Sequence, residues 1–145
     1  MVSKCFGNAV YGVNAYTVTI EVNIGQGTKF FMVGLPDNAV KESQQRVESA
    51  IKHLGYKMPR QKVVINLAPA DIRKEGSSYD LPIALGILHG TAQLITDNLE
   101  KYVIMGELSL DGGLQPVRGV LPIAVAARQQ GLAGLLLPRQ IRHRP

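Results

Sequence analysis

Apolar positions in the first part of the chain alternate with a period of two. Within residues 14–24 the apolar members share one side: Tyr16, Val18, Ile20, Val22 and Ile24. Threonine, glutamate and asparagine occupy the other side, a pattern typical of a half-buried strand. We expect a further strand over residues 3–11. The turn residues 25–28 indicate a hairpin that pairs residues 14–24 with residues 29–35.

After Pro36 the pattern changes to helical spacing. Six residues share one helix face: Val40, Ser43, Val47, Ala50, Ile51 and Leu54. Asp37 or Asn38 can accept the free amide hydrogens of the first turn, and Gly55 can end the helix. The pattern therefore predicts an amphipathic helix that buries this face against a sheet.

Two more helices are predicted further along the chain. Residues 80–94 are apolar nearly all round, which indicates a buried helix, and we expect Asp80 to be its N-cap. Residues 119–130 form the third, ended by Gly131. The strands predicted in this part are residues 62–67, 102–108 and 133–137, with a turn at 111–113. Strands that alternate with helices after an initial meander favour an α/β fold, a mixed sheet covered by helices.

Length and composition indicate one globular domain. The chain has 145 residues, 46% hydrophobic and 19% charged, which excludes wholesale disorder. Its apolar runs are shorter than the ~18 residues of a membrane-spanning helix, and its N-terminus does not resemble a secretory signal. Cys5 has no partner for an internal disulfide. We therefore expect a cytoplasmic protein with no membrane partner.

The charge balance is compatible with a nucleic-acid partner. The net charge is +5, from 16 Lys and Arg against 11 Asp and Glu, and basic surfaces of this kind attract phosphate backbones. The DNA-binding candidates are Lys57, Arg60, Lys62, Arg73 and Lys74. A third basic group ends the chain: Arg139, Arg142, His143 and Arg144. The alternative is a solvated face with no ligand.

Four stretches resemble one family: VGLPDNAVKESQQRV (33–47), INLAPADIRKEGSSYDLPIALGIL (65–88), YVIMGELSLDGGLQPVRGVLPIA (102–124) and GLLLP (134–138). Together they are similar to the N-terminal domain of ComM/YifB-type, magnesium-chelatase-like AAA+ ATPases. That domain resembles the protease domain of Lon and the C-terminal domain of RadA, which implies the same βαβ fold here. Residues 1–138 would be this Lon-protease-like domain, and residues 139–145 a basic tail or the start of a linker to the ATPase.

The resemblance also implies a function and partners. ComM members are DNA helicases that drive branch migration during DNA uptake and recombination, and their ATPases assemble as rings. The chain has no G-x-x-x-x-G-K-[ST] phosphate-binding loop. We therefore expect a fragment without the ATPase domain, in which ATP and magnesium would bind. The expected partners are DNA, that ATPase domain and neighbouring subunits. We expect no cofactor within the chain itself.

A Lon-like peptidase is the alternative function. Lon proteases use a serine activated by a lysine, and Ser78 falls on the position of that serine. Ungapped comparison of the two patterns places Leu121 at the lysine position, and a leucine cannot accept a proton. Lys74 or Arg118 could substitute only within hydrogen-bond reach of Ser78. We therefore expect no catalytic residue, and we interpret Ser77 and Ser78 as part of a capped loop.

Other chemistries fit the sequence less well. His53, His89 and His143 have no cysteine or carboxylate at metal-ligand spacing, so we expect no metal site. A small-molecule kinase would need a glycine-rich phosphate loop, and Gly76-Ser77-Ser78 has too little glycine. A binding and assembly module of an ATPase and a Ser78-dependent peptidase remain the two functional hypotheses.

Overall fold

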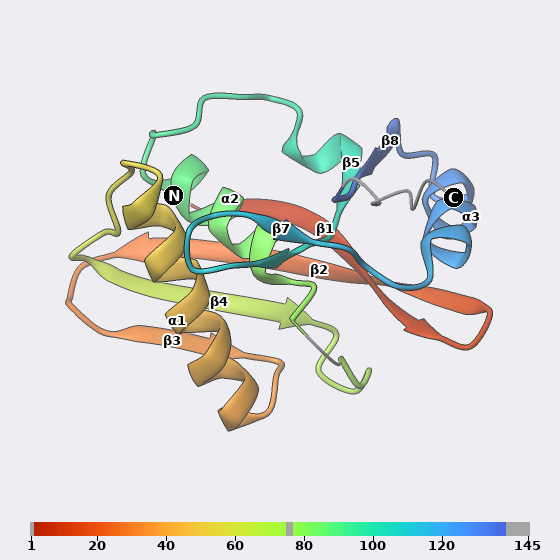
Figure 1. The fold of residues 1–145 in the computed structure, drawn as a ribbon, viewed down its shortest axis with the longest axis horizontal. Coiled ribbons are helices and arrows are strands. Elements are labelled where there is room, and N and C mark those ends of the chain that lie inside the picture. The colour runs from red at the N-terminus through yellow and green to blue at the C-terminus, as the bar shows by residue number, and fades with distance from the viewer. Residues whose placement is uncertain (1, 75–76, 139–145) are drawn as a thin grey trace, which may run out of the picture.

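The computed structural model describes residues 2–74 and 77–138, which form a mixed sheet with helices packed on it (Figure 1). The strands of the main sheet are β1 (Val2–Tyr11), β2 (Asn14–Gly25), β3 (Phe30–Val33), β4 (Lys62–Ala68), β5 (Tyr102–Ile104) and β8 (Gly134–Leu136). Their order across the sheet is β3-β4-β2-β1-β5-β8. The helices are α1 (Asp37–His53), α2 (Asp80–Gly90), α3 (Val120–Gln129) and the short 3-10 helix η1 (Leu99–Lys101). The predicted α/β class, a mixed sheet with helices, is confirmed.

The predicted pairing of the second and third strands is wrong. β2 pairs with β1 and β4, and β3 pairs in parallel with β4. The tight hairpin joins β1 to β2, where Tyr11 pairs with Asn14 and leaves Gly12 and Val13 as a two-residue loop. The segment after β2 instead leads to β3, which lies one strand position away from β2. The chain then passes through α1 and returns as β4, which takes the position between them. β3 and β4 are parallel, and parallel neighbours require a long crossover of this kind.

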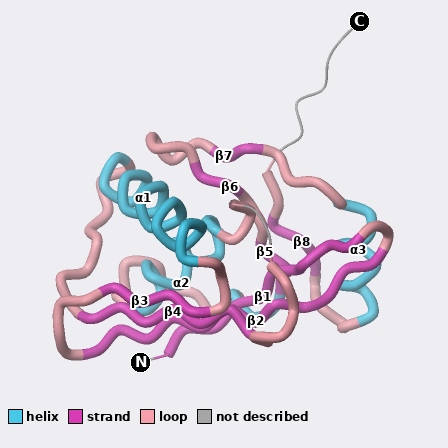
Figure 2. The backbone as a smooth tube through the Cα atoms, turned by 90° about the horizontal axis from the view of Figure 1, so that it is seen from below, coloured by secondary structure: helices cyan, strands magenta, loops and turns pink. Residues whose placement is uncertain are grey.

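The main core lies between the sheet and the two helices α1 and α2, which cover the same face (Figure 2). Among its fully buried side chains are Val18, Ile20, Val22, Val63, Ile65, Leu67, Ile83 and Ile87. α2 approaches β2 closely because residue 86 is a glycine. A Cβ atom there would lie only 2.6 Å from the Val22 side chain. The predicted alternation of β2 is thus confirmed from Val18 to Val22, whereas Tyr16 is exposed.

α3 packs on the opposite face of the sheet, near the β1–β2 hairpin. Cys5 faces α2, since its thiol donates to the Pro82 carbonyl. Val10 lies on the other side of β1, because side chains alternate along a strand. A Cβ atom on Gly119, the residue before α3, would lie 2.8 Å from the Val10 side chain. α2 and α3 therefore lie on opposite faces of the sheet. They also differ in position along it, because α1 lies over β3 and β4 and α3 lies at the other end (Figure 1).

The start of α1 differs from the prediction and its end agrees. Pro36 is the N-cap residue, and no side chain caps the first turn, so the predicted cap by Asp37 or Asn38 is wrong. Asp37 lies instead in the first turn, where its charge suits the helix dipole. Gly55, with φ +87°, follows the end of the helix as predicted. Leu54, expected on the buried face, is exposed.

The second helix is shorter than predicted and is not capped by Asp80. It ends at Gly90 because the following amides turn back, with that of Leu94 bonding to the Leu88 carbonyl at 3.0 Å. Tyr79 precedes the helix without a side-chain cap, and the Asp80 carboxylate has other partners, described below. The predicted strand 102–108 is also divided. β5 ends at Ile104, and β6 (Glu107–Leu108) pairs with β7 (Leu114–Gln115) as a separate small sheet around the predicted 111–113 turn.

Candidate functional site

A buried carboxylate joins α1, α2 and the small sheet. Asp80 is 1% exposed and accepts hydrogen bonds from Arg46 Nε at 2.6 Å, Ser43 Oγ at 2.7 Å and the Leu108 amide at 3.1 Å. Burial raises the pKa of Asp80, and these donors oppose that rise. The hydrogen bond to Asp80 in turn raises the pKa of Arg46. Because this chain itself supplies all these partners, the cluster holds the fold together and leaves little capacity for a ligand.

A cleft of about 620 Å³ lies beside the start of α2. Ser77, Ser78, Glu107, Arg73 and Arg118 are among its lining residues. The Ser77 hydroxyl donates to the Glu107 carboxylate. The serine segment is fixed by its backbone, since the Ser78 carbonyl accepts from the Gly106 amide at 2.7 Å. The cleft thus brings together two serines, one acid and two arginines.

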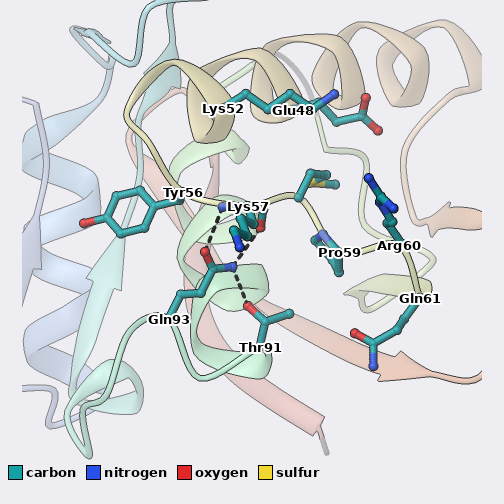
Figure 3. A pocket seen from close by; sticks show the side chains of 10 residues that line it. Glu48, Lys52, Tyr56, Lys57, Pro59, Arg60, Gln61, Thr91 and Gln93 are labelled. Carbon is teal, nitrogen blue, oxygen red and sulfur yellow. Dashed lines mark hydrogen bonds between the residues drawn. The ribbon is translucent and has the colours of Figure 1, made fainter.

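A second cavity, of about 910 Å³, lies between the end of α1 and the loop that follows α2 (Figure 3). We call it the basic groove, because its lining includes Lys52, Lys57 and Arg60 and a single carboxylate, Glu48, among the described residues. Lys52 and Glu48 extend from α1, and Arg60 extends from the loop before β4 (Figure 3). Lys57 and Arg60 are exposed to solvent. The arrangement places cations from two different elements around one hollow.

A single side chain fixes the floor of the basic groove. Gln93 accepts from the Lys57 amide at 2.8 Å through its Oε1 atom. Its Nε2 atom donates to the Lys57 carbonyl at 2.8 Å and to Thr91 Oγ1 at 2.9 Å (Figure 3). These bonds use only the backbone of Lys57, so its ammonium group remains free to face solvent. The loop after α1 is thereby tied to the loop after α2 without using a charged side chain.

Comparison with known proteins places the chain in a family. A family model described as "Subunit ChlI of Mg-chelatase" matches residues 20–141. The chain belongs to the ChlI family. Within the described residues of this ChlI-family chain, the basic groove lies in the matched region, as do the serines, Glu107 and the arginines of the cleft.

Individual relatives agree with this placement. The chain is 50% identical over 124 residues to the uncharacterized protein YifB of Salmonella typhimurium, which covers 85% of this chain and 24% of the relative. It is 43% identical over 136 residues to the competence protein ComM of Haemophilus influenzae, covering 93% of this chain and 26% of the relative. The ChlI-family chain thus spans about a quarter of these relatives' length. The matches support the AAA+ family resemblance drawn from the sequence.

A more distant relative is Lon protease 2 of Bacillus subtilis, 28% identical over 126 residues, or 87% of this chain and 22% of the relative. In the ChlI-family chain the structure describes each of the residues considered as a base for Ser78. Leu121 is 74% exposed on α3. Lys74 donates its ammonium hydrogens to the carbonyls of Pro69 at 2.6 Å and Ile72 at 2.8 Å. Arg118 lines the cleft, but a guanidinium stays protonated and cannot accept a proton.

The five DNA-binding candidates are divided among several parts of the structure. Lys57 and Arg60 line the basic groove. Lys62 begins β4, with its ammonium 5.5 Å from the centre of the Phe31 ring. Arg73 lines the serine cleft. Lys74 is 3% exposed, and burial lowers its pKa, so its ammonium group is directed into the protein in this structure. The basic group at 139–145 lies outside the described residues, as does the predicted linker.

Two residues of the groove carry little signal in the sequence. The helical period puts Lys52 on the solvated face of α1, although its position in the last turn, just before Lys57, is a usable signal. Gln93 falls inside the predicted helix 80–94, and no local pattern marks it as a tie between loops.

Of the histidines, His89 has both ring nitrogens engaged, Nδ1 with Ser3 Oγ at 2.8 Å and Nε2 with the Thr96 carbonyl at 3.1 Å.

Two other kinds of feature are missing from the described residues 2–74 and 77–138. No group of three or more His, Cys, Asp or Glu side chains lies close enough to hold a metal ion there. None of the helices in these ranges has the length and apolar character needed to cross a membrane.

Proposed function

We propose that this chain is a non-catalytic module that binds DNA and supports assembly beside an AAA+ ATPase domain, as in a ComM-like helicase. ATP and magnesium would bind in that ATPase domain, and neighbouring subunits would complete a ring. The observation that carries the DNA-binding part is the basic groove, in which cations from α1 and from the following loop surround one cavity.

The charge of the groove suits a phosphate backbone. Its three cations outnumber its one carboxylate, and Lys57 and Arg60 are exposed. A Gln93 tie holds the two loops together, so the cations need little rearrangement to meet a polyanion. Cations grouped in a concave surface attract phosphates and release the ions condensed on them.

A salt titration tests this function. Duplex DNA carrying a fluorescent label is titrated with the chain at several salt concentrations, and the affinity is followed by anisotropy. We expect binding that weakens as salt rises. The double variant Lys57→Gln with Arg60→Gln should lower the slope of log affinity against log salt by about 1.8, since each lost phosphate contact removes about 0.9.

The chain offers a matched control for that variant. Lys101 and Arg128 are exposed cations of the same two types, and α3 lies far from the groove (Figure 1). Lys101→Gln with Arg128→Gln removes the same charge and should leave the slope within about 0.5 of the parent, because long-range effects are screened by salt. Equal slopes for both double variants would show that the groove is not the DNA site. Failure of the parent to bind at low salt would remove the DNA part altogether.

The peptidase alternative keeps some support because Ser78 lines a cleft and a Lon relative matches the chain. The cations named as its possible partners are occupied or are arginines, so we expect an unactivated hydroxyl. A fluorophosphonate probe should therefore not label the native chain. Labelling that disappears in Ser78→Ala, with Ser77→Ala as the matched control, would favour the peptidase over the binding module.

A further inference from the structure

One face of the sheet is not covered by α1 or α2 over the strands β3, β4 and β2 and the first half of β1 (Figure 2). Directly paired residues share a face, so the strand register identifies its members. One row across the four strands consists of Phe31, Val64, Asn23 and Val2, and the next consists of Val33, Asn66, Glu21 and Lys4. Phe6 pairs with Thr19 in a third row. We call this surface the open sheet face.

Two phenylalanine rings on the open sheet face each have a lysine above them. The Lys62 ammonium lies 5.5 Å from the centre of the Phe31 ring, and the Lys4 ammonium lies 5.6 Å from that of Phe6. Both distances are within the range of cation–π attraction, about 6 Å. Phe31 lies in an edge strand and is 44% exposed. Phe6 is half-buried, so the Phe31 pair presents the larger aromatic surface beside a positive charge, and the Phe6 pair a smaller one.

The polar groups of the open sheet face argue against an apolar protein partner. Between the two aromatic pairs lie Asn66 and Glu21, whose side chains bond to each other at 3.1 Å. An apolar partner would have to bury these groups, which is costly without new hydrogen bonds. The ionisable groups named on this face are Lys4, Lys62 and Glu21, and Asn66 already engages that carboxylate. A partner with negative charges and flat rings fits this surface better.

We infer that the open sheet face binds single-stranded nucleic acid, with bases stacked on Phe31 and Phe6 and the backbone phosphates met by Lys62 and Lys4. Stacking is open to any base because every base has a π-face. A phosphate attracts each ammonium group away from its ring, which frees the ring for a base. The inference rests on the proposed DNA-binding function and names the form of nucleic acid that one surface recognises.

The separation of the two rings sets the size of the ligand. β1 and β3 are separated by β2 and β4, so three strand spacings, about 14 Å, lie between their axes. The rings are also displaced along the strands, because Phe6 aligns with Ala68 and Phe31 with Val64. A strand must therefore span several nucleotides to reach both rings, and an oligonucleotide of about 15 is long enough for sites of this type.

The test compares strands with and without bases. A fluorescein-labelled deoxythymidine 15-mer and an abasic strand of the same length are titrated with the chain by anisotropy. Phe31→Leu keeps an apolar side chain and removes the stacking surface, and Phe31→Tyr keeps that surface. We expect Phe31→Leu to bind the thymidine strand at least about fivefold more weakly, and Phe31→Tyr to bind within about twofold of the parent. The abasic strand should bind weakly to all three.

Further variants separate this inference from the proposed function. Lys62→Gln should lower the salt slope on the thymidine strand by about 0.7, the value for one phosphate of a single strand. Circular dichroism of each variant establishes that it is folded. If Phe31→Leu and Lys62→Gln both bind the thymidine strand as the parent does, the inference is wrong. Should Lys57→Gln with Arg60→Gln alone abolish binding, the groove would be the DNA site and the proposed function would stand.

Discussion

The polar groups around Asp80, at the start of α2, and those around the basic groove differ in their partners. Around Asp80, the chain itself satisfies the carboxylate through Arg46, Ser43 and the Leu108 amide. Around the groove, backbone atoms are tied by Gln93 while the side chains of Lys57 and Arg60 remain exposed. The first region shows charge used to hold elements together, and the second shows charge left available for a ligand. Counting basic residues in the sequence does not separate these two uses.

The largest effect should follow from breaking the buried ion pair. Asp80→Ala leaves the Ser43 hydroxyl and the Leu108 amide without their acceptor and Arg46 without its carboxylate. We expect a loss of about 3–5 kcal/mol in the free energy of unfolding, measured by urea denaturation.

A double-mutant cycle sharpens this measurement. Arg46→Met alone leaves the Asp80 carboxylate buried with fewer donors, and Asp80→Asn alone leaves the Arg46 guanidinium without its carboxylate. The double variant, Arg46→Met with Asp80→Asn, removes both charges. If the effects of the two single variants simply add, Arg46 and Asp80 are not coupled and the region is not held by charge.

The next effect concerns the pH dependence of stability that comes from the Cys5 thiol, which lies against α2. Burial, with a contribution from Glu100, raises the pKa of the Cys5 thiol from 9.0 to about 12. The folded thiol therefore keeps its proton in a range where the unfolded thiol loses it. Stability from this group is complete below pH 9 and falls by about 1.4 kcal/mol per pH unit as the pH rises towards 12. Urea denaturation at pH 8.5 and 10.5 should show a smaller loss for Cys5→Ala than for the parent. If the parent and Cys5→Ala lose equal stability over this range, the thiol does not contribute to the pH dependence.

A matched pair of lysine substitutions tests the comparison directly. Lys74→Met removes the donor from the carbonyls of Pro69 and Ile72 in a buried position, and we expect a loss of about 1–3 kcal/mol. Lys57→Met makes the same change at an exposed position and should alter stability by less than about 0.5 kcal/mol. Thermal or urea denaturation of both variants measures the difference. Equal effects would show that exposure does not distinguish the two lysines.

The smallest stability effect is predicted at the floor of the groove. Gln93→Ala removes three hydrogen bonds that are partly open to water, so we expect a loss of only about 1 kcal/mol. Its effect on DNA affinity should exceed that of Lys101→Gln, although it removes no charge, because the two loops are no longer held together. Unchanged affinity for duplex DNA in Gln93→Ala would show that the tie is unnecessary for the groove.

The sequence is informative where local pattern decides the structure. The alternation in β2, the helical period of α1 and its end at Gly55, and the range of α3 follow from the spacing of apolar residues and glycines. The pairing of β3 with β4 does not, because β4 comes later in the chain and lies between β2 and β3. Nothing in the residues of β2 or β3 indicates that a later strand will separate them. Asp80 resembles a helix cap for the same reason, since its partners lie 28 to 37 residues away in sequence.

The candidate sites are predictable only in part. Charge alone identifies Lys57 and Arg60, and the same argument includes Lys74, whose burial depends on carbonyls of its own loop. Leu121 cannot act as a base in any structure, because an aliphatic side chain accepts no proton. The pairing of Lys62 with Phe31 depends on the register of β4 and β3, which the sequence does not reveal. Lys4 and Phe6 lie two residues apart on one strand, so sequence spacing suggests that pair but not the exposure of its ring.

The position of β4 between β2 and β3 has a consequence for how the chain folds. The β1–β2 hairpin needs only a two-residue loop and can close within microseconds, whereas β3 has no neighbouring strand until residues 62–68 arrive. Closing that long loop carries an entropic cost before any β3 contact forms. The hairpin should therefore acquire protection from amide exchange early, and the amides of Phe31 and Val33 late, together with those of α1.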